Sequence, residues 1–306
     1  MTETNQTSAF DIIILGFEGP TQFRTLLSVI LFLLYSMTLG MNSLIIVLVL
    51  IRHRLHSPMY FFLCHLSITD IIVPSTIVPN LLYVTLLDRG TIPFSNCLSQ
   101  MFFFGIATDA ECLILTVMSY DRYLAICRPL HYMPIMSLKL QILLVTSCWF
   151  VAFSLALMVV CHVLVLQFCD SNIINHLFCD LNPLLKLSCS DTFVVNMEVL
   201  VTGTLILVLA CVLIVVTYIW IFHSILGNST TTGRQKAIST CSSHLTVVCT
   251  YYATLVTNYM IPLTGRTTTF DKYTSLLYIV VTPLMNPIIY TLKNQEIRSA
   301  LNFNIH

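Results

Sequence analysis

The chain has 306 residues, of which 57% are hydrophobic and only 9% are charged. Soluble domains usually carry charge on about a quarter of their residues, so this composition excludes an ordinary soluble protein. The formal net charge is zero, so no basic field points to nucleic acid as a partner. The excess of apolar residues instead predicts an integral membrane protein surrounded by lipid, because the length allows several spans of about 20 residues.

The first twenty residues are polar apart from a short apolar run at residues 12–15. That run is too short for the apolar core of a cleavable signal peptide, and no basic residue precedes it. We therefore expect the first membrane span to act as its own uncleaved signal. Glycosylation sequons begin at Asn5, in this polar N-terminal segment, and at Asn228, much later in the chain.

Seven apolar stretches follow, each near or above the length that a helix needs to cross the hydrocarbon layer. They cover residues 26–51, 60–82, 98–120, 140–161, 194–222, 237–261 and 273–292. The predicted fold class is an all-α membrane protein, a seven-transmembrane helix bundle at 26–292 between a tail at 1–25 and a final segment at 293–306. In that segment Ile297, Ala300 and Leu301 recur at helical spacing and predict a short amphipathic helix on the inner membrane surface, with a frayed tail as the alternative.

Basic residues predict which side of the membrane each loop faces, because cytoplasmic loops carry an excess of Lys and Arg. With the N-terminus outside, the cytoplasmic segments hold Arg52, Arg54, Arg122, Arg128, Lys139, Arg234, Lys236, Lys293 and Arg298. The outer segments hold Arg24, Arg89, Lys186, Arg266 and Lys272. We therefore expect a protein of the cell membrane with an extracellular N-terminus and a cytoplasmic C-terminus. In this orientation Asn5 is glycosylated and Asn228 is not.

Four cysteines fall on the predicted outer face, where oxidising conditions favour disulfides: Cys97, Cys169, Cys179 and Cys189. Four cysteines allow three pairings, and spacing does not choose between them. Residues 176–180 (HLFCD) could also be interpreted as soft ligands for copper or zinc. A cysteine in a disulfide cannot ligate as a thiolate, so we expect no metal centre there.

Several polar residues stand inside predicted spans, among them Asn42, Asp70, Asp109, Glu111 and Asn286. A charge in a span costs roughly 3 kcal/mol on insertion scales. Asn42, Asp70, Glu111 and Asn286 predict an internal polar network that takes up sodium or protons near Asp70 and Glu111. The alternative is a static cluster that only fixes helix packing. Successive residues of a helix turn by about 100°, so Asp109 and Glu111 cannot face the same partner. Asp109 stays open between contact with a ligand and a structural role.

Four motifs occur in order along the chain: residues 55–63 (LHSPMYFFL), 118–127 (MSYDRYLAIC), 236–244 (KAISTCSSH) and 283–290 (PLMNPIIY). Together they resemble the motifs of odorant receptors, a branch of the rhodopsin-like G-protein-coupled receptors. Residues 128–132 (RPLHY) are similar to the tetrapod-type class of that family. Met41, Ser119 and Thr217 depart from the family's usual glycine, alanine and serine.

The resemblance implies a receptor that binds a small, mostly apolar odorant and activates an olfactory stimulatory G protein, which raises cyclic AMP. It implies a switch formed by Asp121, Arg122, Tyr123, Tyr218, Lys236, His244, Asn286, Pro287 and Tyr290. Helix depth and family precedent together predict a ligand pocket formed by Phe104, Gly105, Thr108, Asp109, Thr202, Ile206, Tyr252, Leu255, Tyr259 and Ile279. The resemblance also implies the disulfide Cys97–Cys179, and we expect Cys169–Cys189 to close the lid loop on itself.

Two rival classes find less support in the sequence. Transporters usually have inverted repeats and broken helices near the midplane, and we find neither pattern. No nucleophile, base and orienting residue fall together as an enzyme would require, and His244 stands alone in its span. A receptor for a peptide or a metabolite stays open as the alternative.

Overall fold

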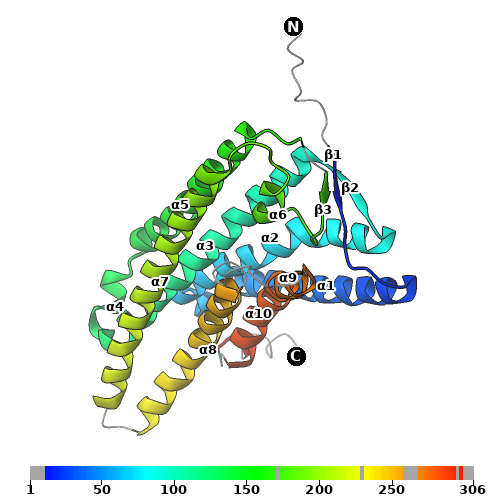
Figure 1. Cartoon of the computed structure of the whole chain (residues 1–306). Helices are drawn as coiled ribbons and strands as arrows, with labels where there is room; N and C mark the ends of the chain where they lie inside the picture. The colour runs from blue at the N-terminus through cyan, green and yellow to red at the C-terminus, as the bar shows by residue number, and fades with distance from the viewer. Residues whose placement is uncertain (1–10, 170–171, 228–230, 258–267, 294–295, 299–306) are drawn as a thin grey trace.

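The structure is a computed structural model that describes residues 11–169, 172–227, 231–257, 268–293 and 296–298. Helices dominate it (Figure 1). In chain order they are α1 (Thr21–Ile51), the 3₁₀ turn η1 (His53–Leu55), α2 (Pro58–Leu87), α3 (Phe94–Cys127), α4 (Pro129–Ile135), α5 (Leu138–Val165), α6 (Leu181–Leu185), α7 (Phe193–Gly227), α8 (Thr231–Leu255), α9 (Thr268–Leu276), the π-helical segment η3 (Leu277–Val281) and α10 (Thr282–Lys293). The long helices coincide with the predicted spans, with α9, η3 and α10 together forming the last, so the predicted seven-helix fold is confirmed.

Among the described residues, six helical segments are long and apolar enough to cross a membrane by length and composition. They are α1, α2, α3, α5, α7 and the segment Phe270–Thr291. The remaining long helix, α8, is less apolar because the polar motif at residues 236–244 lies inside it. It still packs as a bundle helix, against α10, α3 and α7. The chain is therefore a multi-pass membrane protein.

Prolines mark several helix ends near the membrane boundary. α2 begins at Pro58, where the missing N–H costs no helical hydrogen bond. α3 runs from Phe94 to Cys127, further than the apolar stretch predicted at 98–120. It is flanked by Pro93 and by Arg128, whose position before Pro129 disfavours helical geometry. α3 thus begins and ends beside prolines rather than where the apolar residues stop.

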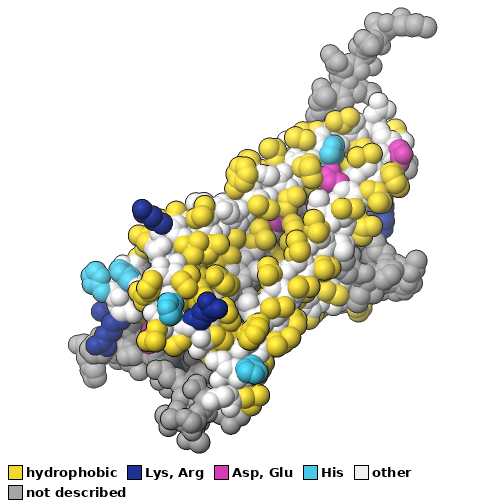
Figure 2. Space-filling view, turned by 90° about the vertical axis from the view of Figure 1, so that its left-hand side faces the viewer, with side chains coloured by type: hydrophobic (Ala, Val, Ile, Leu, Met, Phe, Trp, Pro, Cys, Tyr) yellow, Lys and Arg dark blue, Asp and Glu magenta, His cyan; other side chains and the backbone are white. Residues whose placement is uncertain are grey.

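The outer surface of the bundle is apolar. Leu50 and Phe150, on α1 and α5, are 70% and 72% exposed, and most of the exposed side chains along α7 are also large and hydrophobic. Figure 2 shows hydrophobic side chains over the middle of one face, with Lys, Arg and His mostly near one end and Asp and Glu near the other. Exposed apolar surface of this extent is unfavourable in water and suits contact with lipid chains.

The interior is organised around α3, which packs against α2, α5 and α7. The bundle has two distinct ends (Figure 1). The disulfide end carries α6, the disulfide-bonded loop before α7 and the strands described next. The opposite end, called the Arg122 end, carries η1, α4 and the last turns of α3.

A small sheet that the sequence analysis did not predict covers the disulfide end. In the described part of the chain, β1 (Asp11–Ile14) lies between β2 (Gly90–Pro93) and β3 (Ile173–Ile174). β1 pairs antiparallel with β2 and parallel with β3. Ile12 and Ile14 are fully buried while Asp11 is exposed, which is the period of two expected for a strand with one face on a core. The segment predicted as an N-terminal tail at residues 1–25 thus contains a strand at Asp11–Ile14.

The predicted C-terminal amphipathic helix is described only at residues 296–298, which are helical. Ile297 is buried in the main core, and the Tyr60 hydroxyl donates a hydrogen bond to Glu296 Oε2 at 2.8 Å. Both contacts tie this turn to the Arg122 end. Ala300 and Leu301, together with both sequon residues Asn5 and Asn228, lie outside the described residues.

Candidate functional site

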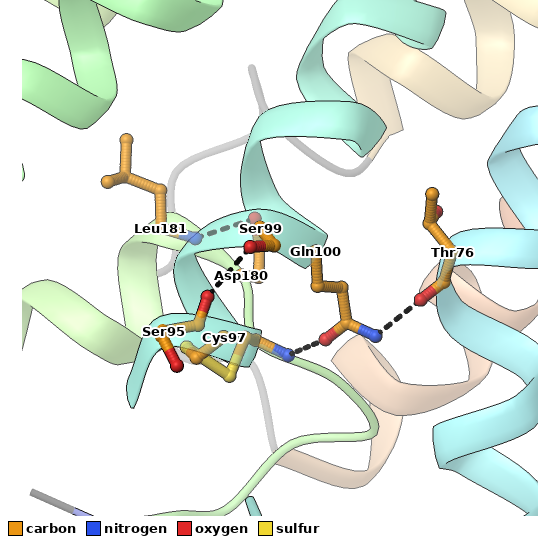
Figure 3. The surroundings of a disulfide bond; sticks show 8 residues. Thr76, Ser95, Cys97, Ser99, Gln100, Asp180 and Leu181 are labelled. Carbon is orange, nitrogen blue, oxygen red and sulfur yellow. Dashed lines mark hydrogen bonds between the residues drawn. A yellow bond between two sulfur atoms is a disulfide. The ribbon is translucent and has the colours of Figure 1, made fainter. Parts of the chain in front are cut away.

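Two disulfides join the four cysteines in the pairing that was expected for them. Cys97 at the start of α3 is bonded to Cys179, with Cα atoms 5.3 Å apart, and Cys169 is bonded to Cys189. Gln100 reinforces the first bond (Figure 3), because its side chain accepts from Cys179 N at 2.9 Å and donates to Thr76 O at 2.8 Å. The loop is thereby attached to α3 and, through Gln100, to α2. Because Cys179 is disulfide-bonded, the thiolate metal ligand weighed for residues 176–180 does not form.

Asp180 and His176 fix the loop beside this disulfide. Asp180 caps α6 by accepting from Leu181 N at 2.8 Å, and burial raises the pKa of its carboxyl to about 6. His176 packs edge-on against Phe178, and burial lowers the pKa of its imidazole to about 4. The loop therefore has a defined conformation over the bundle and brings residues 180–182 to the top of an internal cavity.

That cavity has a volume of about 500 Å³ and lies between α3, α5 and α7 under the lid of residues 180–182. Its size suits a small molecule, since such sites usually measure about 300–1,000 Å³. Seven predicted pocket residues line it: Phe104, Gly105, Thr108, Asp109, Thr202, Ile206 and Leu255. The sequence argument thus identified much of the α3 and α7 walls, although contact with a ligand stays a prediction.

Three predicted pocket residues are not part of this lining. Tyr252 points its hydroxyl at α3, where it lies 3.3 Å from Cys112 Sγ and 3.4 Å from Thr116 Oγ1. Ile279 is fully buried in η3, whose π-helical turn changes the face that each residue presents. Tyr259 lies outside the described residues. The structure thus keeps Tyr252 and Ile279 in the packed core rather than at the cavity.

The α5 wall and part of the α7 wall were missed by the sequence argument. The additional lining residues are Met101, Cys112, Leu155, Ala156, Val159, Val160, Asp180, Leu181, Asn182, Asn196, Val199, Leu200, Gly203 and Leu207. Small residues were the available signal, because they leave room where helices meet. A Cβ added at Gly203 would have no heavy atom within 4 Å, and one at Gly105 would meet only the Ala156 Cβ, at 3.5 Å.

Deeper in the bundle, the predicted polar network is assembled. Asn286 Nδ2 donates to Asp70 Oδ1 at 2.9 Å and lies 3.4 Å from Glu111 Oε1. Asn42 Nδ2 donates to Pro283 O at 3.1 Å, which joins α1 to α10. All of these side chains are buried, and the oxygens Asn42 Oδ1 and Thr282 Oγ1 have no protein partner among the described residues. The network therefore links four helices and retains unpaired oxygen atoms.

At the Arg122 end, the charged side chains of the second motif, residues 118–127, are held inside the protein. Arg122 is only 9% exposed and forms an ion pair with its neighbour Asp121. The Tyr132 hydroxyl of α4 donates to the other Asp121 oxygen at 2.7 Å. Tyr123 is half-buried and stacks against Tyr120. In this conformation the guanidinium of Arg122 is occupied by its own chain.

A second contact closes the same end between α7 and α8. The Tyr218 hydroxyl lies 2.7 Å from His244 Nδ1, and the two rings are stacked. His244 Nε2 and the Tyr290 hydroxyl are buried and have no partner among the described residues. Pro287 is buried within α10, while the side chain of Lys236 is not described. The predicted switch residues that are described thus gather on neighbouring helices, and their role stays a prediction.

The fold and this site define a membrane protein of the seven-helix class. A family model described as olfactory receptor matches residues 31–305. The chain is 40% identical over 301 residues to olfactory receptor 1f45 of Rattus norvegicus, covering 98% of this chain and 96% of the relative. It is 42% identical over 304 residues to olfactory receptor 1F1 of Homo sapiens, with the same coverage of 98% and 96%. The chain therefore belongs to the olfactory receptor family, whose members are receptors and not enzymes.

Proposed function

We propose that this receptor binds a small, mostly apolar odorant in the cavity between α3, α5 and α7 and activates a stimulatory G protein, which raises cyclic AMP. The observation that carries the proposal is the cavity itself, which joins a mainly apolar wall to a few polar groups. Small-molecule sites have this composition because apolar walls supply affinity and a few polar groups supply orientation.

Coupling to the G protein is proposed to depend on the contacts that close the bundle at the Arg122 end. A ligand can shift an equilibrium only by its differential affinity for two states. In the proposed active state α8 moves away from α7, so the contact between Tyr218 and His244 opens and Arg122 leaves Asp121 for the G protein. The pairing of Arg122 inside its own chain supports this proposal, because release would make a new donor available.

The proposed orientation places the N-terminus and the disulfide end outside the cell and the Arg122 end in the cytoplasm. The excess of basic residues in the segments at the Arg122 end supports it. The disulfides support it as well, since they form and persist in oxidising compartments. In this orientation Asn5 is accessible to glycosylation, and the proposed location is the cell membrane.

The buried network around Asp70 is proposed to take up a sodium ion. The available ligands are carboxylate oxygens of Asp70 and Glu111 and the unpaired oxygens of Asn42 and Thr282. Oxygen ligands suit hard cations, and a cation there would offset the cost of two buried acids. Replacing external sodium with choline should then change ligand potency in the wild type but not in Asp70→Asn.

The decisive experiment is an odorant panel applied to cells that express this chain with a cyclic AMP reporter. We expect a concentration-dependent response to a subset of small apolar compounds, and no response in cells without the chain. A receptor that reaches the surface and responds to none of the panel, with the olfactory stimulatory G protein co-expressed, would contradict the proposal.

A further inference from the structure

The charged groups that line the cavity are all acidic. Asp109 comes from α3 and Asp180 from the lid, and the described lining contains no Lys, Arg or His. Asp180 is already used, because its Oδ1 accepts from Leu181 N at 2.8 Å. The cavity therefore presents negative charge and no charged donor to whatever occupies it.

The neutral polar groups of the lining add more acceptors than donors. The Thr108 hydroxyl donates to Phe104 O at 2.9 Å, and the Thr202 hydroxyl donates to Glu198 O at 2.7 Å. Both hydroxyl protons are thus consumed within their own helices, and only oxygen lone pairs remain, of which one at Thr108 already accepts from the Tyr278 hydroxyl at 3.0 Å. Asn196 uses an amide N–H on Thr192 Oγ1 at 3.0 Å, while Asn182 adds an amide at the lid. Most of the polar positions can therefore receive a hydrogen bond more readily than give one.

Asp109 is the acceptor that lacks a partner. It lies deep in the bundle, the surface that it retains lines the cavity, and no hydrogen bond or ion pair joins it to another described residue. An unpaired carboxylate in an apolar environment is costly, and a cation placed against it recovers that cost. Gly105 precedes it by one turn on the same face of α3 and has no side chain, so the space over the carboxylate stays open.

We propose that the cavity takes a small alkyl amine, whose protonated nitrogen contacts the Asp109 carboxylate and whose hydrocarbon part packs against Val159, Ile206 and Leu207. This inference rests on the receptor function proposed above and names its ligand class. An alkylammonium group is a donor without acceptors and carries the complementary charge. Ketones, esters and carboxylic acids bring acceptors, for which this lining offers few donors beyond the amides of Asn182 and Asn196. Acids also bring a negative charge beside Asp109.

The test compares ligands that share a carbon skeleton. Straight and branched amines of four to eight carbons are applied with the corresponding alcohols and carboxylic acids to cells that express the full chain with the cyclic AMP reporter. Amines should act at concentrations at least about tenfold lower than the alcohols, and the acids should be inactive. Alcohols or acids that match the amines in potency would overturn the ligand class while leaving the receptor function intact.

Asp109→Asn removes the charge and keeps the shape of the side chain. It should raise the half-maximal concentration of the amines about 100-fold and change that of any active alcohol by less than about threefold. Asp88→Asn is the matched control, because it removes a half-exposed carboxylate at the end of α2 that pairs with Arg24 and is not part of the cavity lining. An equal response of wild type and Asp109→Asn to the amines would overturn the proposal.

Two further measurements need no variant, and the second does not depend on signalling. Amines that carry a trifluoromethyl group on the carbon next to the nitrogen are mostly neutral at pH 7. They should lose potency on the wild type relative to their parent amines, and equal potency would contradict a charge contact. In nanodiscs, amines should raise the unfolding temperature of the purified wild type more than alcohols do. Such stabilisation without any cyclic AMP response would support the amine site and contradict the proposed coupling.

Discussion

The two ends of the bundle are closed by different kinds of bond. At the disulfide end, two covalent cross-links and a strand pairing attach the loop and the N-terminal segment to the helices. At the Arg122 end, closure depends on an ion pair, a tyrosine hydrogen bond to Asp121 and the contact between Tyr218 and His244. Covalent bonds hold a frame in one arrangement, whereas ion pairs and hydrogen bonds can be exchanged at small cost. The comparison indicates a fixed end that holds the cavity and an exchangeable end suited to a switch.

The largest expected effect comes from breaking the fixed end. Cys97→Ser removes a cross-link that spans 82 residues and should cost about 2–5 kcal/mol, enough to abolish surface delivery. Cys169→Ser opens a bridge over only 20 residues and should cost about 1 kcal/mol less. Cell-surface labelling measures the delivery of both variants. Cys161→Ser, which replaces an exposed free cysteine, is the control. Normal surface delivery of Cys97→Ser would contradict the idea of a fixed end.

Replacing Arg122 tests the exchangeable end. Arg122→Gln should abolish the ligand-driven rise in cyclic AMP while surface expression stays near the wild-type level. The reason is that the charge proposed to meet the G protein is gone while the helix packing around it remains. Arg128→Gln, at an exposed position, is the control and should signal normally. Unchanged signalling by Arg122→Gln would refute the coupling role.

A pH titration sharpens the comparison at the lid. The pKa of His176 falls from 6.5 to about 4 on burial, so below about pH 6.5 the unfolded chain binds a proton that the folded chain excludes. Its stabilising contribution is complete above that pH and is lost as the pH falls towards 4. Between pH 7 and pH 5 the wild type should lose about 2 kcal/mol relative to His176→Gln. The raised pKa of Asp180 acts in the opposite direction, but it is present in both proteins and cancels.

Unfolding temperatures of the two purified proteins at pH 7, 6 and 5 provide the measurement. Parallel slopes would mean that His176 does not titrate as its burial implies.

Filling the cavity should have a moderate effect. Gly203→Leu adds a side chain where a Cβ meets nothing within 4 Å, so the helix should tolerate it while the space for a ligand shrinks. Ligand potency should fall about tenfold or more without loss of surface expression. Gly40→Leu is a matched control on the exposed face of α1, because its Cβ also meets nothing within 4 Å. Equal potency in both variants would place the ligand elsewhere.

The smallest effect is expected from a single hydroxyl at the Arg122 end. Tyr132→Phe removes the hydrogen bond to Asp121 Oδ1, which should loosen the closed arrangement by about 1 kcal/mol and raise basal cyclic AMP a few-fold. Tyr120→Phe, at an exposed tyrosine without a hydrogen bond to Asp121, is the control. An equal rise of basal cyclic AMP in both variants would contradict a role of the Tyr132 hydrogen bond in the switch.

The helices were predictable because membrane spans are local features of sequence. A stretch such as residues 194–222 contains the length and the apolarity that define α7. β1 was not predictable in the same way, since its pairing partners Ile92 and Ile173 lie about 80 and 160 residues further along the chain. Four residues with alternating burial carry too little local pattern to reveal such a pairing.

The residues of the candidate site also differ in how clearly the local sequence reveals them. Asp70, Glu111 and Asn286 were found because a polar residue inside a span is conspicuous, and their hydrogen bonds confirm that they form one network. Leu155 and Val159 were missed because α5 is apolar on every side, so lipid-facing and cavity-facing positions carry the same residue types. Tyr252 and Ile279 were assigned to the pocket by depth, which does not specify the direction of a side chain.

The position of β1 sets an order of events during biosynthesis. The first strand to be made is the central one of the three, so it acquires its second neighbour only after residue 174 has emerged from the ribosome. Until then, the edge of β1 that faces β3 has no strand partner. Closure of this sheet consequently requires that the four long helices α1, α2, α3 and α5 and the loop residues up to 174 have been synthesised.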